Sequence, residues 1–200
     1  AENSIVVASG ANMLLNEQDV DKVVEEMYEG DILLMQLEIP IRTVEYAARR
    51  AFEKGVKVVL NPAPARSLPK ELLRYLFMIT PNRIEAEMLT GIKIVNDADA
   101  ERVAKEISAM GVQNIIVTLG SKGCLVREGD TSYCVDAFKV EPVDTTAAGD
   151  TFNGALCVGL AEGMNLRQAA VMASKASSVA VTRMGAQSSI PHRKELDLNE

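Results

Sequence analysis

The stretch from residue 32 to residue 60, ILLMQLEIPIRTVEYAARRAFEKGVKVVL, holds a strand, a helix and a second strand in direct succession. Residues 32–37 form an apolar run that predicts a buried strand, and residues 56–60 predict the next one. Between them, small and apolar side chains recur at helical spacing, and Gly55 ends the helix. These side chains are Val44, Ala47, Ala48, Ala51 and Phe52. Such a unit predicts two parallel neighbouring strands joined by a helix.

The same alternation continues on both sides of this unit. Upstream, the apolar face of a helix ends before Gly30, and downstream another helix ends at Gly111 and leads into a strand at residues 114–119. The two faces consist of Val20, Val23, Val24 and Met27 in the first helix, and of Val103, Ala104, Ile107 and Met110 in the later one. A glycine stop before each strand indicates a chain that returns repeatedly to one sheet.

The last third of the chain changes in character. Residues 124–127 and 131–135 predict a short antiparallel hairpin. Two helices follow, at about residues 151–162 and 166–181, and Asn165 has the side chain of an N-cap for the second. We therefore predict an α/β fold with a doubly wound, mostly parallel sheet flanked by helices.

Length and composition set limits on the function. Two hundred residues, 48% hydrophobic and 24% charged, suit a single globular domain over residues 1–200. A net charge of −7 without basic runs argues against nucleic acid as a partner. No apolar stretch reaches the roughly 18 residues of a membrane span, which argues against a membrane protein. The three cysteines, Cys124, Cys134 and Cys157, lack metal-ligand spacing and favour a reducing compartment, the cytoplasm.

The segment with the clearest chemical content is residues 143–152, VDTTAAGDTF. Its small residues lead directly into a helix, so the backbone N–H groups of Ala147, Ala148 and Gly149 can point toward one anion. A carboxylate beside a bound phosphate is useful if Asp150 removes a proton from a hydroxyl that attacks the phosphate. The alternative is that Asp150 is an acidic residue of the kind favoured in the first turn of a helix.

Other candidate residues follow strands, at the edge of the sheet where α/β folds bind ligands. Residues 118–123, TLGSKG, form a glycine-bounded turn that suits either a nucleotide site or a plain hairpin. In residues 80–87, TPNRIEAE, Asn82 and Glu85 have the spacing of a capping box, although both could instead hold hydrated Mg²⁺ beside phosphates. Glu38 ends a strand at the same edge, either as a solvated rim residue or as a ligand contact.

Together, these segments resemble, in their order and in their residues, the ribokinase-like family of sugar and nucleoside kinases. The matching segments are residues 61–65 (NPAPA), 80–87, 118–123 and 144–152, and residues 34–38 and 181–187 are similar to the ribokinase branch. The resemblance covers residues 1–193 but only the C-terminal part of the family's fold. It implies that residues 1–8 are the last strand of a lid. It also implies that the N-terminal strands, the sugar-gripping Gly-Gly segment and most of the lid lie outside this sequence.

The resemblance implies ATP-dependent phosphorylation of a sugar hydroxyl, by likeness the 5-hydroxyl of D-ribose, with Mg²⁺ bound beside the nucleotide. Asp150 is then the general base, and the amides of Ala147, Ala148 and Gly149 form an anion hole. The implied ATP-binding residues are Asn82, Thr118, Leu119, Gly120, Ser121, Lys122, Gly123, Gly149, Asp150 and Ser174, the last at a place where ribokinases often have His or Asn. The implied magnesium-side residues are Asn82 and Glu85, and the implied sugar contacts are Glu38 and Asp150.

By the same resemblance, K⁺ binds beside the anion hole. Its implied ligands are Asp144, the Thr146 carbonyl, the carbonyls of Ala180, Arg183 and Gly185, and Ser189. Complete members of the family pair through the lid, which implies a homodimer for the complete protein. Two alternatives stay open: another sugar kinase of the same family, and a truncated module that binds nucleotide without catalysis.

Overall fold

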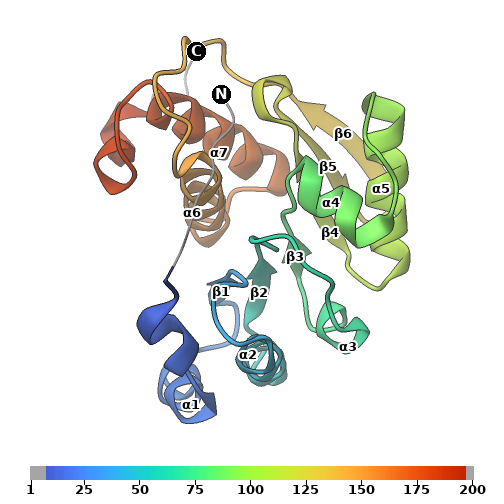
Figure 1. Ribbon diagram of the computed structural model, residues 1–200, viewed down its shortest axis with the longest axis vertical. Coiled ribbons are helices and arrows are strands. Elements are labelled where there is room, and N and C mark those ends of the chain that lie inside the picture. The colour runs from blue at the N-terminus through green and yellow to red at the C-terminus, as the bar shows by residue number, and fades with distance from the viewer. Residues whose placement is uncertain (1–7, 197–200) are drawn as a thin grey trace.

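The protein is built around one six-stranded sheet, seen in a computed structural model that describes residues 8–196 (Figure 1). The strands are β1 (Ile32–Met35), β2 (Lys57–Leu60), β3 (Met78–Ile79), β4 (Asn114–Thr118), β5 (Cys124–Glu128) and β6 (Thr131–Val135). They lie in chain order, with β1 to β4 parallel and β4 to β6 antiparallel. The predicted mostly parallel sheet and the predicted hairpin are confirmed. The predicted lid strand at residues 1–8 lies outside the described residues, apart from Ala8.

Helices cover both faces of the sheet, as predicted (Figure 1). They are α1 (Glu17–Glu25), α2 (Ile41–Glu53), α3 (Lys70–Leu73), α4 (Arg83–Thr90), α5 (Asp97–Ala109), α6 (Ala148–Ala161) and α7 (Leu166–Ala180), with short 3₁₀ turns at Gly10–Leu14, Gly120–Lys122, Gln187–Ser189 and Arg193–Glu195. Within residues 8–196, no helix combines the length and the apolar character needed to cross a membrane.

Alternation along the strands divides the core into two layers. Val58, Leu60 and Ile79 belong to the cluster that includes residues of helices α1 to α5. Val59 and Met78 point to the opposite face and pack with residues of α6 and α7. Because successive side chains of a strand point to opposite faces, the residue after Leu60 and the residue after Ile79 point toward α6 and α7.

The register of the first three strands brings their carboxyl ends level with one another. Met35 pairs with Leu60, and Leu60 pairs with Ile79. The ladder continues one residue beyond the strands, because the N–H of Asn61 donates to the Met35 carbonyl at 2.9 Å and the N–H of Thr80 donates to the Leu60 carbonyl at 3.0 Å. The first residues after β1, β2 and β3 therefore form a row at one edge of the sheet.

Two predicted core side chains are exposed instead. Val23 of α1 is 57% exposed and Phe52 of α2 is 53% exposed. Each is the direct neighbour of a buried residue, Val24 and Ala51, and one residue turns the side chain by about 100° around a helix. The ring of Phe52 packs at the surface against Tyr75, with ring centroids 5.6 Å apart.

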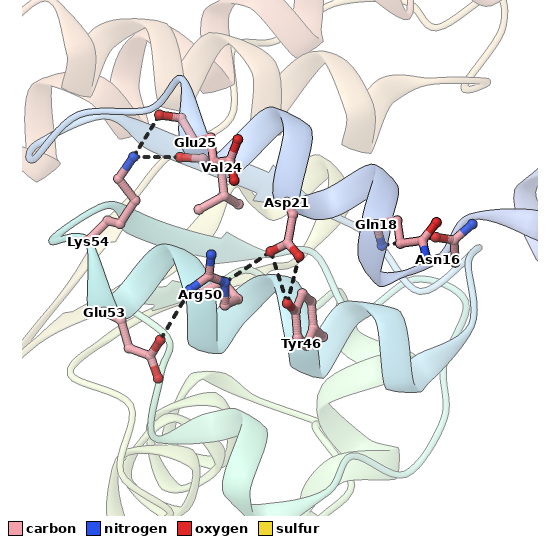
Figure 2. A network of polar contacts seen from close by, with 9 residues as sticks. All are labelled: Asn16, Gln18, Asp21, Val24, Glu25, Tyr46, Arg50, Glu53 and Lys54. Carbon is pink, nitrogen blue, oxygen red and sulfur yellow. Dashed lines mark hydrogen bonds and ion pairs between the residues drawn. The ribbon is translucent and has the colours of Figure 1, made fainter.

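Besides the buried side chains of Val20 and Val24, polar contacts attach helix α1 to α2 (Figure 2). The carboxylate of Asp21 accepts hydrogen bonds from the Tyr46 hydroxyl, at 2.9 and 3.0 Å, and from Nε of Arg50, at 3.1 Å. The hydrogen bond to Asp21 raises the pKa of Tyr46, because it stabilises the protonated phenol. Lys54 donates to two carbonyls at the carboxyl end of α1, at 2.8 and 2.9 Å.

We expect Tyr46→Phe to loosen α1 and to lower the urea concentration at which the protein unfolds, because Asp21 loses a donor while the ring stays in place. Tyr28→Phe is the matched control, since Tyr28 is 77% exposed. Urea unfolding followed by circular dichroism compares the two variants. Equal midpoints for both would contradict a stabilising role for this contact.

Candidate active site

Helix α6 begins with a sharp reversal of the chain at Ala147. This residue has a φ of 59°, which residues other than glycine rarely adopt, and it is the N-cap of the helix. The first N–H group with an acceptor inside the helix is that of Thr151, which donates to the Ala147 carbonyl at 2.9 Å. The N–H of Ala148 reaches back to the Thr145 carbonyl at 3.3 Å. The amides of Gly149 and Asp150 thus belong to the first helical turn, which offers unpaired donors to an anion.

A cavity of about 470 Å³ lies against this helix start. Its lining includes Thr118, Gly120, Ala148, Gly149 and Ser174, together with apolar side chains such as Phe138 and Phe152. A Cβ atom on Gly149 would meet no other atom within 4 Å, so the space above this residue is open. A largely apolar cavity bordered by helix-start amides suits a ligand with a flat apolar part and an anionic part.

The carboxylate of Asp150, in the first turn of α6, is exposed and reaches the end of β1. Its Oδ1 accepts a hydrogen bond from Nε2 of Gln36 at 2.7 Å. The same Nε2 donates to Oδ1 of Asn61 at 3.2 Å. Two neighbouring strand ends are therefore linked to Asp150 through one amide group.

A second set of contacts links α6 to the end of β3. The buried hydroxyl of Thr80 donates to Oδ1 of Asn153 at 2.6 Å, and Nδ2 of Asn153 donates to the Gly149 carbonyl at 2.9 Å. Thr80 also accepts through its backbone carbonyl, from Nδ2 of Asn61 at 3.1 Å. Thr80 thus joins both sets of contacts that hold the first turn of α6.

The residues of the turn at 118–123 line two separate hollows. Thr118, Gly120, Ser121 and Gly123 line the large cavity, whereas Leu119 and Lys122 line a separate notch of about 200 Å³ that also borders Ser121. Leu119 and Lys122, both predicted to bind ATP, therefore do not line the large cavity. Gly123 has a φ of 86°, and a Cβ there would collide with the Val135 carbonyl, so its glycine is required by packing within the hairpin.

Asn82 and Glu85 form the predicted capping box at the start of α4. The N–H of Glu85 donates to Oδ1 of Asn82 at 2.9 Å, while both oxygens of Glu85 accept from Asn82 at 2.8 Å. Gly91 ends the helix in the left-handed conformation. Burial raises the pKa of the Glu85 carboxyl, against the lowering effect of the Asn82 N–H.

The donor set suits a magnesium ion that keeps most of its waters, since only one carboxylate is present and its oxygens already accept hydrogen bonds. Asn82 lies beside Thr118, with which it forms a parallel bridge, so the capping box borders the nucleotide-sized cavity without lining it. Within residues 8–196, no group of three or more His, Cys, Asp or Glu side chains could hold a metal ion by itself.

Asp144 ties the loop before α6 to the segment after α7. Its Oδ1 accepts from the N–H of Thr146 at 2.9 Å, and its Oδ2 accepts from the N–H of Gly185 at 3.0 Å. Hydrogen bonds from Thr146 and Gly185 lower the pKa of Asp144, so its charge persists in mildly acidic solution. The N–H groups of Val143 and Asp144 also donate to the Val181 carbonyl.

The other predicted cation ligands belong to the same two segments. Ser189 is fully buried and donates to the Ala186 carbonyl at 2.7 Å, while the Ala180 carbonyl accepts from the N–H of Arg183 at 3.0 Å. All these candidate ligands are oxygens, and a carbonyl that accepts one hydrogen bond keeps a second lone pair. This donor chemistry fits a hard cation such as K⁺.

Among the remaining candidates, Glu38 lies exposed beyond the end of β1, and Ser174 is buried in α7 at the wall of the cavity. The thiol of Cys124 lies beside Ser174, and burial raises its pKa to about 12, so it stays protonated at neutral pH. Sequence reasoning gave no role to Gln36, Thr80 or Asn153. Gln36 and Thr80 each follow directly on an observed strand end, but Gln36 lies inside the strand predicted at residues 32–37 and no strand was predicted before Thr80, so the linear pattern did not single them out.

Comparison with known proteins agrees with this arrangement. The profile of the pfkB family of carbohydrate kinases matches residues 1–193. The chain belongs to this family. The ribokinase of Haemophilus influenzae, a pfkB-type relative, is 46% identical over 195 residues, which are 98% of this chain and 64% of that protein.

Two solved ribokinase structures share the fold of this pfkB-family chain. The structure of Thermotoga maritima ribokinase superposes with a TM-score of 0.86 at 40% identity, and that of Arabidopsis thaliana ribokinase complexed with ribose and ATP with a TM-score of 0.88 at 31% identity. Each comparison covers 98% of this chain and 64% of the other. The chain therefore spans less than two thirds of the length of these relatives.

Gly149→Ala tests whether the open space above α6 holds a ligand. Because Gly149 is helical, alanine should stabilise the protein by roughly 0.4–1 kcal/mol, yet its methyl group would enter the cavity and weaken the binding of ATP. Thermal unfolding and calorimetric titration with MgATP measure the two effects.

Gly154→Ala, in the same helix and also with nothing within 4 Å of the added Cβ, is the matched control. It should bring the gain in stability without the loss of affinity. Unchanged ATP affinity in Gly149→Ala would place the ligand elsewhere.

Proposed function

We propose that the protein transfers the γ-phosphoryl group of ATP to a sugar hydroxyl, and that the sugar is D-ribose, phosphorylated at its 5-hydroxyl. The observation that carries the proposal is the start of α6, where Gly149 of the first helical turn borders the cavity and the carboxylate of the next residue, Asp150, lies at the end of β1 beside Gln36. The relatives at 46% and 40% identity are ribokinases, and the Arabidopsis structure contains ribose and ATP.

In the proposed reaction, Asp150 accepts the proton of the sugar hydroxyl as the hydroxyl oxygen forms a bond to the γ-phosphorus. The bond from phosphorus to the bridging oxygen breaks, and ADP leaves with that electron pair. Because Oδ1 of Asp150 accepts from Gln36, Oδ2 takes the proton. Negative charge on the transferring group lies against the amide of Gly149 at the positive end of the helix dipole, whereas the N–H of Ala148, predicted for the same role, already donates to the Thr145 carbonyl.

The nucleotide would occupy the cavity between the hairpin and α7, with its base among the apolar side chains and its phosphates toward Gly149. Thr118, Gly120, Ser121, Gly123 and Ser174 are placed to line it. Mg²⁺ bound with ATP would supply positive charge on the phosphates, held through water on the side of Asn82 and Glu85. Glu38, exposed beyond β1, would contact the sugar.

Asp150→Asn should lower kcat by about 10²- to 10⁴-fold while leaving folding and ATP binding intact, because an amide cannot take the hydroxyl proton. ADP release with D-ribose, Mg²⁺ and K⁺ measures this in the natural protein that contains the sequence. Asp130→Asn, on the exposed hairpin turn, is the control and should keep full turnover. Full turnover in Asp150→Asn would overturn the assignment. ATP binding without any sugar-dependent turnover would favour a nucleotide-binding module.

We also propose that K⁺ binds at the Asp144 loop and holds the anion-binding turn in place. Replacing K⁺ with tetramethylammonium at equal ionic strength should lower kcat, because the bulky cation cannot occupy an oxygen-lined site of this kind. Asp144→Asn should be slow in both salts, since it loses the charge that favours the cation. Equal kcat in both salts for the unmodified protein would exclude a functional cation here.

A further inference from the structure

Three polar side chains stand in a row at the edge of the sheet that faces α6. Gln36, Asn61 and Thr80 each follow the last residue of a strand, and the register of β1, β2 and β3 places them side by side. Asn61 and Thr80 are 8% and 1% exposed. Buried polar side chains at these positions need hydrogen-bond partners, and each finds its partner within the row or in α6.

The partners also decide which way each amide group points. The carbonyl of Thr80 can only accept a hydrogen bond, so Asn61 must turn Nδ2 toward it, at 3.1 Å. Oδ1 of Asn61, also an acceptor, is thereby directed at Gln36. Gln36 must therefore donate from its NH₂ group, at 3.2 Å, and the same group also donates to Asp150.

We propose that Gln36 is a positioning residue for the carboxylate of Asp150, and that Asn61 orients the Gln36 amide for this task. The inference rests on the proposed function, because it describes how the proposed base is held. Gln36 has a spare hydrogen on Nε2 for each of its two acceptors, so one amide serves both contacts. With Oδ1 of Asp150 engaged at 2.7 Å, the rotation of the carboxylate is restricted and Oδ2 presents its lone pairs to the sugar hydroxyl.

The proposal assigns a role to the side chain of Asn61, the first residue of the NPAPA segment. The side chain of Asn61 links a backbone carbonyl of the rigid sheet to an exposed carboxylate that would otherwise be free to rotate. A catalytic group displaced by about 1 Å can lose on the order of 10²-fold in rate, which sets the scale of the expected effect.

Gln36→Met keeps the length of the side chain and removes both donors. In the natural protein that contains the sequence, we expect kcat for ribose phosphorylation to fall by about 10- to 100-fold with little change in KM for ATP, since the nucleotide cavity does not include Gln36. The kcat of Gln36→Glu should fall further, because the new carboxylate has no hydrogen to donate and would repel both Asp150 and Oδ1 of Asn61. Gln113→Met, at an exposed position before β4, is the matched control and should keep full activity.

Two double variants separate positioning from a merely structural role. In an Asp150→Asn background, Gln36→Met should change the residual rate by less than about 2-fold, because its effect passes through Asp150. As a single variant, Asn61→Ala should lower kcat. In the Gln36→Met background, the same substitution should lower kcat little further. Circular dichroism and thermal unfolding confirm that each variant folds.

The outcomes distinguish this inference from the proposed function. Full kcat in a folded Gln36→Met variant, with Asp150→Asn still inactive, would overturn the positioning role and leave Asp150 as the base. A drop in rate of equal size with and without Asp150 would also overturn it. Full turnover in Asp150→Asn would instead remove the proposed base, and with it the premise of the inference.

Discussion

The candidate site depends on the register between the first three parallel strands. With Met35, Leu60 and Ile79 level, the residues that follow them lie in one row on the face covered by α6. A slip of one residue in β2 would turn Asn61 to the other face and expose Leu60 to α6. The large buried side chains of the two layers, among them Leu60, Ile79, Val59 and Met78, oppose such a slip, so packing in the core sets the geometry of the polar edge.

The start of α6 is held from three directions, and this explains how a strained residue can persist there. Phe152 and Leu156 pack the helix onto the sheet, Asn153 joins it to Thr80, and the hydroxyl of Ser177 in α7 donates to the Ala148 carbonyl at 3.0 Å. Ala147 would relax toward negative φ if its surroundings allowed, at a gain of order 1–3 kcal/mol for such residues. The surrounding contacts instead fix the turn, and its amides face the cavity before any ligand arrives.

The periodicity of the sequence was sufficient to predict the strands and helices, but not the hydrogen bonds between side chains of distant elements. The strand–helix–strand unit, the hairpin and the capping box of Asn82 and Glu85 rest on neighbours within a few residues, which a linear pattern records. The contact between Gln36 and Asp150 joins residues 114 positions apart, and it depends on how the amide of Asn61, at the end of the neighbouring strand, is turned. Likewise, nothing in TLGSKG predicts that Leu119 and Lys122 line a notch separate from the large cavity.

The two halves of the site differ in how far this chain builds them. The nucleotide side is enclosed by the hairpin, α6 and α7, all within residues 118–181, and has a formed cavity. On the side proposed for the sugar, Asp150 and Glu38 are exposed near the end of β1. Water competes for the lone pairs of an exposed carboxylate and for the phosphoryl group, so efficient transfer needs a cover over this side. The relatives have about a third of their length beyond the part matched here, which is room for such a cover. Under the proposed function, nucleotide binding and phosphoryl transfer are therefore physically separable, and the row from Thr80 to Gln36 is the part of the proposed sugar side that the sheet itself holds in place.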